Sequence, residues 1–125
     1  KMHTGLDFTA DIGTEIYATG DGVVESIESK YSGYGQHVII NHGFGYESLY
    51  AHMSRVAVRP GQKVRRGQII GYVGNTGTST GPHLHYEVMK NGEKVDPSFY
   101  FYSDITPEQY EDMLKRSANA KQSFD

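Results

Sequence analysis

The sequence contains no cysteine, and none of its apolar runs is long. Without cysteine the chain can form neither a disulfide nor a thiolate metal site, so a metal would have to be held by histidine or carboxylate side chains. No apolar run approaches the roughly 18–20 residues that a membrane-spanning helix needs. The sequence therefore predicts no transmembrane segment in this chain.

An excess of positive charge is also absent. Lysine and arginine together number 12 against 15 aspartates and glutamates, which gives a net charge of −3 and a pI of about 6.1. This balance gives no electrostatic reason to expect binding to nucleic acid or to an anionic membrane. The 125 residues are enough for one domain and too few for two. No signal peptide is visible, but the chain opens inside a motif, so we expect a longer precursor in which a further domain can lie upstream.

Glycine and tyrosine are abundant instead, with 15 and 10 residues. Short strand patterns recur between turn signals, and helical periodicity is confined to the tail. This arrangement predicts a mostly β fold, an antiparallel sandwich or barrel, and argues against parallel units because the helices that would connect them are missing. The predicted strands cover residues 6–9, 15–18, 22–27, 36–41, 47–51, 68–73 and 84–89, with turns at 42–45 and 59–64.

A short C-terminal helix is predicted over about residues 107–117. Thr106 is a typical N-cap, Pro107 suits the first helical position, and Gln109 completes a capping box. Three apolar residues then fall at helical spacing on one face: Tyr110, Met113 and Leu114. We therefore divide the chain into a β domain over residues 1–102 and a helix with a polar tail over residues 103–125.

Two pairs of polar residues have spacings that suit a metal site. His3 and Asp7 would lie about 13 Å apart on a flat strand, too far to share one ion, but Gly5 between them can bend or bulge the backbone. His83 and His85 lie on one strand face, roughly 6.6 Å apart. One of them could bind a metal while the other addresses a water on it, and the spacing does not say which does which.

Further histidines complete the set. His52 follows a predicted strand, and the loop 74–82, rich in glycine, serine and threonine, leads into His83. Each of these features alone is ordinary in a β protein, and we interpret His37 and His42 as structural or surface residues. Taken together, three nitrogen and oxygen ligands with an open position are typical of catalytic zinc, whereas a structural zinc site normally uses four protein ligands.

The chain resembles the LytM/lysostaphin-type zinc metallopeptidases, the M23 peptidases, over about residues 2–100. The motifs that carry the resemblance occur in the family's order: His3-x-Gly5-x-Asp7, Tyr50-Ala51-His52 and Ser79-Thr80-Gly81-Pro82-His83-Leu84-His85-Tyr86-Glu87. The resemblance implies a barrel-sandwich hybrid (duplicated hybrid motif), an antiparallel sheet with a groove walled by loops. It also implies that an upstream strand of the family is missing here, and that residues 1–102 form the peptidase domain.

The same resemblance implies roles for individual residues. One Zn²⁺ would be held by His3, Asp7 and His85, and the catalytic histidines beside the zinc-bound water would be His52 and His83. One of the two would take a proton and the other would steady the oxyanion, and which one is the base stays open. The implied activity is a zinc-dependent endopeptidase that cuts the stem and cross-link peptides of peptidoglycan. We favour a D,D-endopeptidase of the cell envelope, periplasmic or extracellular.

Two other classes of function are open to the sequence. The first is a catalytically inactive module that binds cell wall or activates another envelope hydrolase, with exposed tyrosines as stacking platforms. The second is a biotinyl or lipoyl carrier domain, which the stretch Val64–Gly71 and the segment before Lys90 superficially resemble. The carrier is disfavoured because the lysine follows the glycine-rich hairpin in the wrong order and the histidine set would have no purpose.

Overall fold

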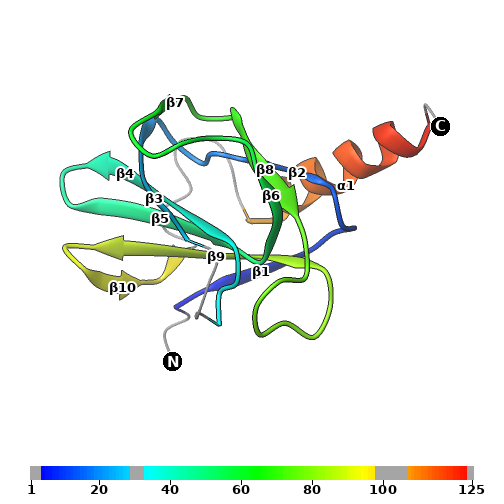
Figure 1. Ribbon diagram of the computed structural model, residues 1–125, viewed down its shortest axis with the longest axis horizontal. Helices are drawn as coiled ribbons and strands as arrows, with labels where there is room; N and C mark the ends of the chain where they lie inside the picture. Colours follow the sequence, from blue (N-terminus) through cyan, green and yellow to red (C-terminus); the bar gives the residue numbers. More distant parts are fainter. Residues whose placement is uncertain (1–3, 29–32, 98–106, 124–125) are drawn as a thin grey trace.

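The computed structural model describes residues 4–28, 33–97 and 107–123. These residues form two antiparallel β-sheets and one C-terminal helix, which confirms the predicted fold class (Figure 1). The strands are β1 (Leu6–Thr9), β2 (Glu15–Tyr17), β3 (Gly22–Glu28), β4 (His37–Gly43), β5 (Tyr46–Ala51), β6 (Met53–Val56), β7 (Lys63–Val64), β8 (Ile69–Val73), β9 (His83–Lys90) and β10 (Glu93–Val95), and the helix is α1 (Pro107–Ser123).

The larger sheet has the order β1-β9-β5-β4-β3-β7, with β10 also paired to β9. The smaller sheet has the order β2-β8-β6. Every pairing is antiparallel, and the β4–β5 hairpin turns where the sequence predicted it. Strand β9 is flanked by β1 on one side and β5 on the other, so both neighbours converge on its first residues.

Alternation along β9 separates the core from the site. Leu84, Tyr86 and Val88 are buried in the hydrophobic core. His83 and His85 point to the opposite face of the strand, because successive side chains of a strand alternate. The register then brings Asp7 of β1 directly opposite His85.

Polar side chains inside the core are hydrogen-bonded to one another. The hydroxyls of Tyr50 and Tyr86 both lie 2.8 Å from the Thr19 hydroxyl, and Ser48 donates to Tyr50 at 2.9 Å. In the part of the chain that the structure describes, no buried side-chain nitrogen or oxygen lacks a partner. This network satisfies the tyrosine hydroxyls, so the rings can fill the core below β9 and β5.

Three short strands were not predicted. Strands β6 and β10 carry few apolar residues, and β7 is a two-residue strand inside a segment predicted as a turn. Such segments lack the apolar alternation that marks a strand, and they become strands because a neighbour offers hydrogen-bonding partners. Pairing with a neighbouring strand here outweighs the weak intrinsic preference of these residues for β structure.

Helix α1 begins at Pro107, as predicted, but it extends to Ser123 rather than ending near residue 117. The added residues include Ala118, Ala120 and Lys121, which favour helix. The predicted apolar face packs on the core through Tyr110 and Leu114, both fully buried. This helix is not long and apolar enough to cross a membrane, and it is the only one among the described residues.

Candidate active site

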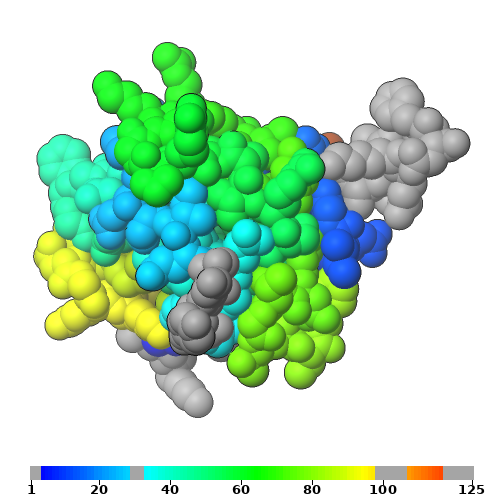
Figure 2. Space-filling view, viewed as in Figure 1, coloured from blue at the N-terminus to red at the C-terminus, as the bar shows by residue number. Residues whose placement is uncertain are grey.

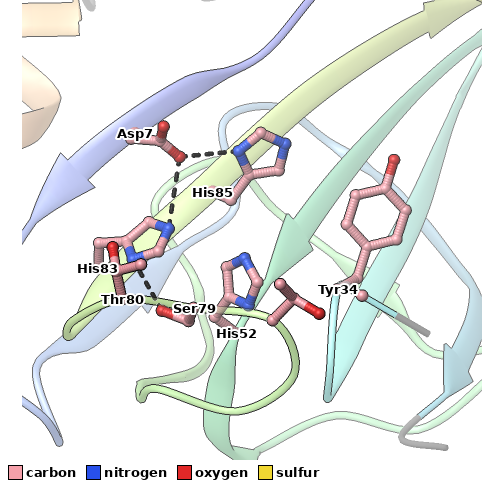
Figure 3. Close-up of a pocket in the computed structure, with 9 residues that line it drawn as sticks. Asp7, Tyr34, His52, Ser79, Thr80, His83 and His85 are labelled. Carbon is pink, nitrogen blue, oxygen red and sulfur yellow. Dashed lines mark hydrogen bonds and ion pairs between the residues drawn. The ribbon is translucent and has the colours of Figure 1, made fainter. Parts of the chain in front are cut away.

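Four of the five predicted site residues come together in one pocket. Asp7 lies on β1, His83 and His85 on β9, and His52 in the link between β5 and β6 (Figure 3). The pocket has a volume of about 440 Å³ and opens to solvent. The fifth residue, His3, lies outside the described residues, as does the boundary predicted between residues 102 and 103.

Asp7 faces both histidines of β9. Its Oδ1 lies 2.8 Å from Nδ1 of His85 and 3.5 Å from Nε2 of His83. The other nitrogen of His85, Nε2, lies 2.8 Å from Oε2 of Glu87. His85 is therefore held between two carboxylates, one on each ring nitrogen.

This environment determines the protonation state of His85. A neutral imidazole carries a single N–H and can donate to only one carboxylate, whereas a protonated ring donates to both. The hydrogen bond to Glu87 is the main cause that raises the pKa of His85; burial opposes it, and the bond to Asp7 adds to the rise. A cation bound by Nδ1 and Asp7 would take the place of one proton and leave the other on Nε2.

The donor set fits a zinc ion. Imidazole nitrogen and carboxylate oxygen are both zinc ligands, and two ligands of a tetrahedral zinc lie about 3.3 Å apart at ordinary bond lengths. The observed 2.8 Å between Nδ1 of His85 and Oδ1 of Asp7 is a direct hydrogen-bond contact, so the two atoms would have to move about 0.5 Å apart to share an ion. The described residues alone contain no group of three ligands arranged for an ion, and the third predicted ligand, His3, lies outside them.

His52 has an unusual backbone that is held from both sides. Its φ of 62° lies in the left-handed region that non-glycine residues rarely adopt. Its backbone N–H donates to the carbonyl of Tyr34 at 2.8 Å, and its Nδ1 lies 2.6 Å from the carbonyl of Thr76. Strain of this kind persists where surrounding contacts fix it, as at catalytic sites.

The hydrogen bond to Thr76 fixes the tautomer of His52. Nδ1 must carry the proton that the carbonyl accepts, so Nε2 has a free lone pair when the ring is neutral. Burial lowers the pKa of His52, which favours the neutral form; its residue is only 5% exposed. His52 therefore has the protonation state that a general base requires.

His83 is oriented in the same manner. Its Nδ1 lies 2.7 Å from the carbonyl of Gly81 and 3.2 Å from the hydroxyl of Ser79. Its ring centroid is 4.7 Å from that of His52. Two neighbouring imidazoles thus each donate Nδ1–H to a backbone carbonyl, so either can act as a base through Nε2 when neutral or as an oxyanion partner through Nε2–H when protonated.

The glycine-rich loop 74–82 forms one wall of the pocket. Its residues 78–80 line the pocket, and Thr78 N–H donates to the carbonyl of Gly33 at 2.9 Å. A Cβ on either Gly77 or Gly35 would overlap the backbone of the opposite segment. Figure 2 shows the two segments side by side, the loop in yellow-green and the segment from Gly33 in cyan.

Gly5 has a role that the sequence did not indicate. A Cβ at this position would overlap the imidazole of His85, so glycine is needed for the close approach of the ring. The bend proposed between His3 and Asp7 involves residues outside the described part of the chain. The same glycine therefore bears on the site through His85, a residue 80 positions away in the sequence.

Sequence reasoning missed Tyr34 and Glu87 as site residues. Tyr34 lines the pocket, and its ring is stacked on His85 with centroids 5.9 Å apart. Glu87 is buried and contacts His85 directly. The alternation His83-x-His85-x-Glu87 could have placed Glu87 on the same face, whereas no local pattern marks Tyr34.

His37 and His42 lie apart from this pocket. Nδ1 of His37 contacts the carbonyl of Gly35 at 2.8 Å. His42 contacts the Asp21 carbonyl and the Ser48 hydroxyl, and burial lowers its pKa. Neither residue lines the pocket, and both stay interpreted as structural or surface residues.

Residues 1–97 match the family model described as Peptidase family M23. The chain belongs to peptidase family M23. Curated relatives in this family include the DD-carboxypeptidase/endopeptidase Mpg of Neisseria meningitidis, 48% identical over 97 residues, and the peptidoglycan DD-endopeptidase ShyA of Vibrio cholerae, 50% identical over 95 residues. The aligned regions cover 78% and 75% of this chain but only 22% of each relative.

Solved M23 structures share the fold. The catalytic domain of lysostaphin from Staphylococcus simulans is 36% identical with a TM-score of 0.76, and the match covers 82% of this chain and 80% of that one. A zinc-containing peptidase from Vibrio cholerae is 39% identical with a TM-score of 0.72, covering 82% and 31%. Family and fold are thereby established for this chain.

Proposed function

We propose that the chain is the catalytic part of a zinc-dependent endopeptidase that hydrolyses peptide cross-links of peptidoglycan, as a D,D-endopeptidase. The observation that carries the proposal is the convergence of Asp7, His85, His83 and His52 on one open pocket. His3, Asp7 and His85 would hold the zinc. A zinc ion there would supply Lewis-acid activation of the scissile carbonyl and of a water.

The two remaining histidines would handle protons and charge. A lone pair on Nε2 of His52 or His83 can accept a proton from the attacking water, and the other ring, when protonated, can donate its Nε2–H to the oxyanion. The lowered pKa of His52 makes it the better candidate for the base. The carbonyls of Thr76 and Gly81 hold the two rings in place throughout, because each accepts the Nδ1 proton.

The names of the relatives support the substrate. Several curated relatives are named as peptidoglycan DD-endopeptidases. Peptidoglycan lies in the cell envelope, so we place the enzyme there, periplasmic or extracellular, with stem and cross-link peptides as its partners. We keep residues 1–102 as the peptidase domain and residues 103–125 as an added helix and tail.

The test is digestion of purified peptidoglycan, followed by mass spectrometry of the released muropeptides. We expect cross-linked dimers to become monomers with new D-alanine carboxyl termini. His52→Ala and His83→Ala should each reduce turnover by about 10²–10⁴-fold with zinc still bound, because each removes a positioned acid–base group.

His42→Gln serves as the matched control, since this histidine lies outside the pocket and its variant should stay active. Near-normal turnover in both catalytic variants would disprove the assigned roles. Zinc binding without any cleavage by the wild type would instead support an inactive module that binds cell wall.

A further inference from the structure

The carboxylate of Glu87 is the centre of a hydrogen-bonded group beside the pocket. Its residue is 4% exposed, and burial alone would raise its pKa. Hydrogen bonds from His85 and Tyr34, together with the charge of Lys94, outweigh burial and lower the pKa of Glu87. A buried carboxylate needs hydrogen-bonding partners on both oxygens, and His85, Tyr34 and Lys94 surround this one.

Each partner of Glu87 is directed at the carboxylate. Tyr34 Oη donates to it, 2.8 Å from each oxygen, and Nε2 of His85 donates to Oε2 at 2.8 Å. The ammonium of Lys94 on β10 lies 3.6 Å from Oε1. Every one of these groups is a donor, so the carboxylate accepts on both oxygens at once.

We infer that Glu87 is a positioning residue for metal binding, held in place by Tyr34 and Lys94. This inference rests on the proposed zinc function. By accepting the Nε2 proton, Glu87 forces the lone pair of His85 onto Nδ1, the nitrogen that faces Asp7. An imidazole that donates its other N–H to a carboxylate is also a stronger metal ligand, because the carboxylate raises its basicity.

The stacked ring of Tyr34 completes the arrangement. It lies nearly parallel to His85, at 22° between planes, and so packs along one face of the imidazole. Its hydroxyl is then fixed by Glu87 and restrains the carboxylate in return. Tyr34 should therefore act on the metal site through Glu87.

Metal titration of the full chain tests the inference. We expect Glu87→Gln, which keeps the side-chain volume, to weaken zinc affinity by about 10–100-fold in competition with a chelating dye. When both proteins are loaded with cobalt in place of zinc, the visible absorption spectrum of Glu87→Gln should differ from that of the wild type. A purely structural role of Glu87 would not produce this difference. Glu93→Gln is the control, since Glu93 is an exposed carboxylate on the same β9–β10 hairpin.

Tyr34→Phe supplies a second arm that keeps the ring and removes one hydroxyl. Tyr34→Phe should lose less zinc affinity than Glu87→Gln. When Glu87→Gln is already present, adding Tyr34→Phe should cost almost no further affinity, because the hydroxyl acts through the carboxylate. Unchanged zinc affinity and cobalt spectrum in both variants would overturn the inference. Failure of the wild type to bind zinc at all would overturn the proposed function, and the inference with it.

Discussion

At the residue scale, the site depends on backbone contacts as much as on its ionisable side chains. His52 is held by the carbonyls of Tyr34 and Thr76, and His83 by that of Gly81. These carbonyls are supplied by two loops that touch through Gly35 and Gly77. A substitution that shifts this contact should therefore move a catalytic histidine without altering it chemically.

Gly77→Ala should show this effect. Its φ of 75° disfavours any side chain, and the new Cβ would overlap the backbone of Gly35, so the loop and the Thr76 carbonyl must move. We expect a loss of about 1–2 kcal/mol in the free energy of unfolding and a clear drop in peptidoglycan cleavage.

Gly81→Ala is the matched control within the same loop. A Cβ at Gly81 meets nothing within 4 Å, so stability and activity should both stay near those of the wild type. Urea unfolding and the muropeptide assay measure the two quantities. Equal behaviour of the two alanine variants would show that the contact with Gly35 is not needed.

At the element scale, Tyr110 hydrogen-bonds helix α1 to the smaller sheet. Tyr110 accepts a hydrogen bond from the Tyr17 N–H at 3.1 Å and donates to the Tyr17 carbonyl at 2.6 Å, while its ring lies edge-on to Phe8. Burial raises the pKa of Tyr110 well above its usual value. The first half of the helix therefore packs on the core beside β2, and the rest projects away from the sheets (Figure 1).

Tyr110→Phe should separate the hydrogen bonds from the packing. The ring stays, but both bonds to the Tyr17 backbone are lost, so the free energy of unfolding should fall by about 1–3 kcal/mol. Arg116→Ala, which breaks an exposed ion pair with Asp112, should change it by less than about 0.5 kcal/mol. Denaturant titrations of the three proteins would measure this, and equal stability of Tyr110→Phe and wild type would refute it.

At the scale of the whole molecule, the pocket exists only when distant segments fold together. Asp7 and His85 are 78 positions apart, and His52 comes from a third segment. Global stability therefore controls the integrity of the site. The sheet also carries a pair of carboxylates, Glu25 and Glu47, that makes this stability depend on pH.

The hydrogen bond with Glu25 is the main cause that raises the pKa of Glu47 to about 7, with burial next. The unfolded chain has the ordinary value near 4.3, so the folded state binds this proton more tightly. The stabilisation is complete below about pH 4.3 and is lost as pH rises through about 7. Because Glu47 is partly exposed, we expect the free energy of unfolding to change by less than about 1 kcal/mol over this pH range.

Glu47→Gln should remove this component of the pH dependence. The variant should be more stable than the wild type at pH 8 and closer to it at pH 5, in urea unfolding at both values. Glu108→Gln, on the exposed surface of α1, is the control and should leave the pH profile unchanged. If the free energy of unfolding of Glu47→Gln changed between pH 5 and 8 as much as that of the wild type, the pH dependence would not come from the proton between Glu47 and Glu25.

The sequence alone determined the class of fold and the candidate histidines. Strand alternation placed His83 and His85 on one face, and Pro107 marked the start of the helix, because both signals are local periodicities or backbone constraints. The three weak strands and the C-terminal part of α1 were missed, because their local patterns are ambiguous. His3 stays a predicted ligand.

Tertiary structure alone decided how these residues are used. Contacts between distant segments fixed which nitrogen of His85 faces Asp7, and they placed Tyr34 and Glu87 beside it. The sequence shows which side chains are available, whereas the pairing of β1, β5 and β9 determines which of their atoms come into contact. Tautomers, pKa values and metal-ligand geometry depend on those contacts, so they follow from the fold and not from the spacing of residues along the sequence.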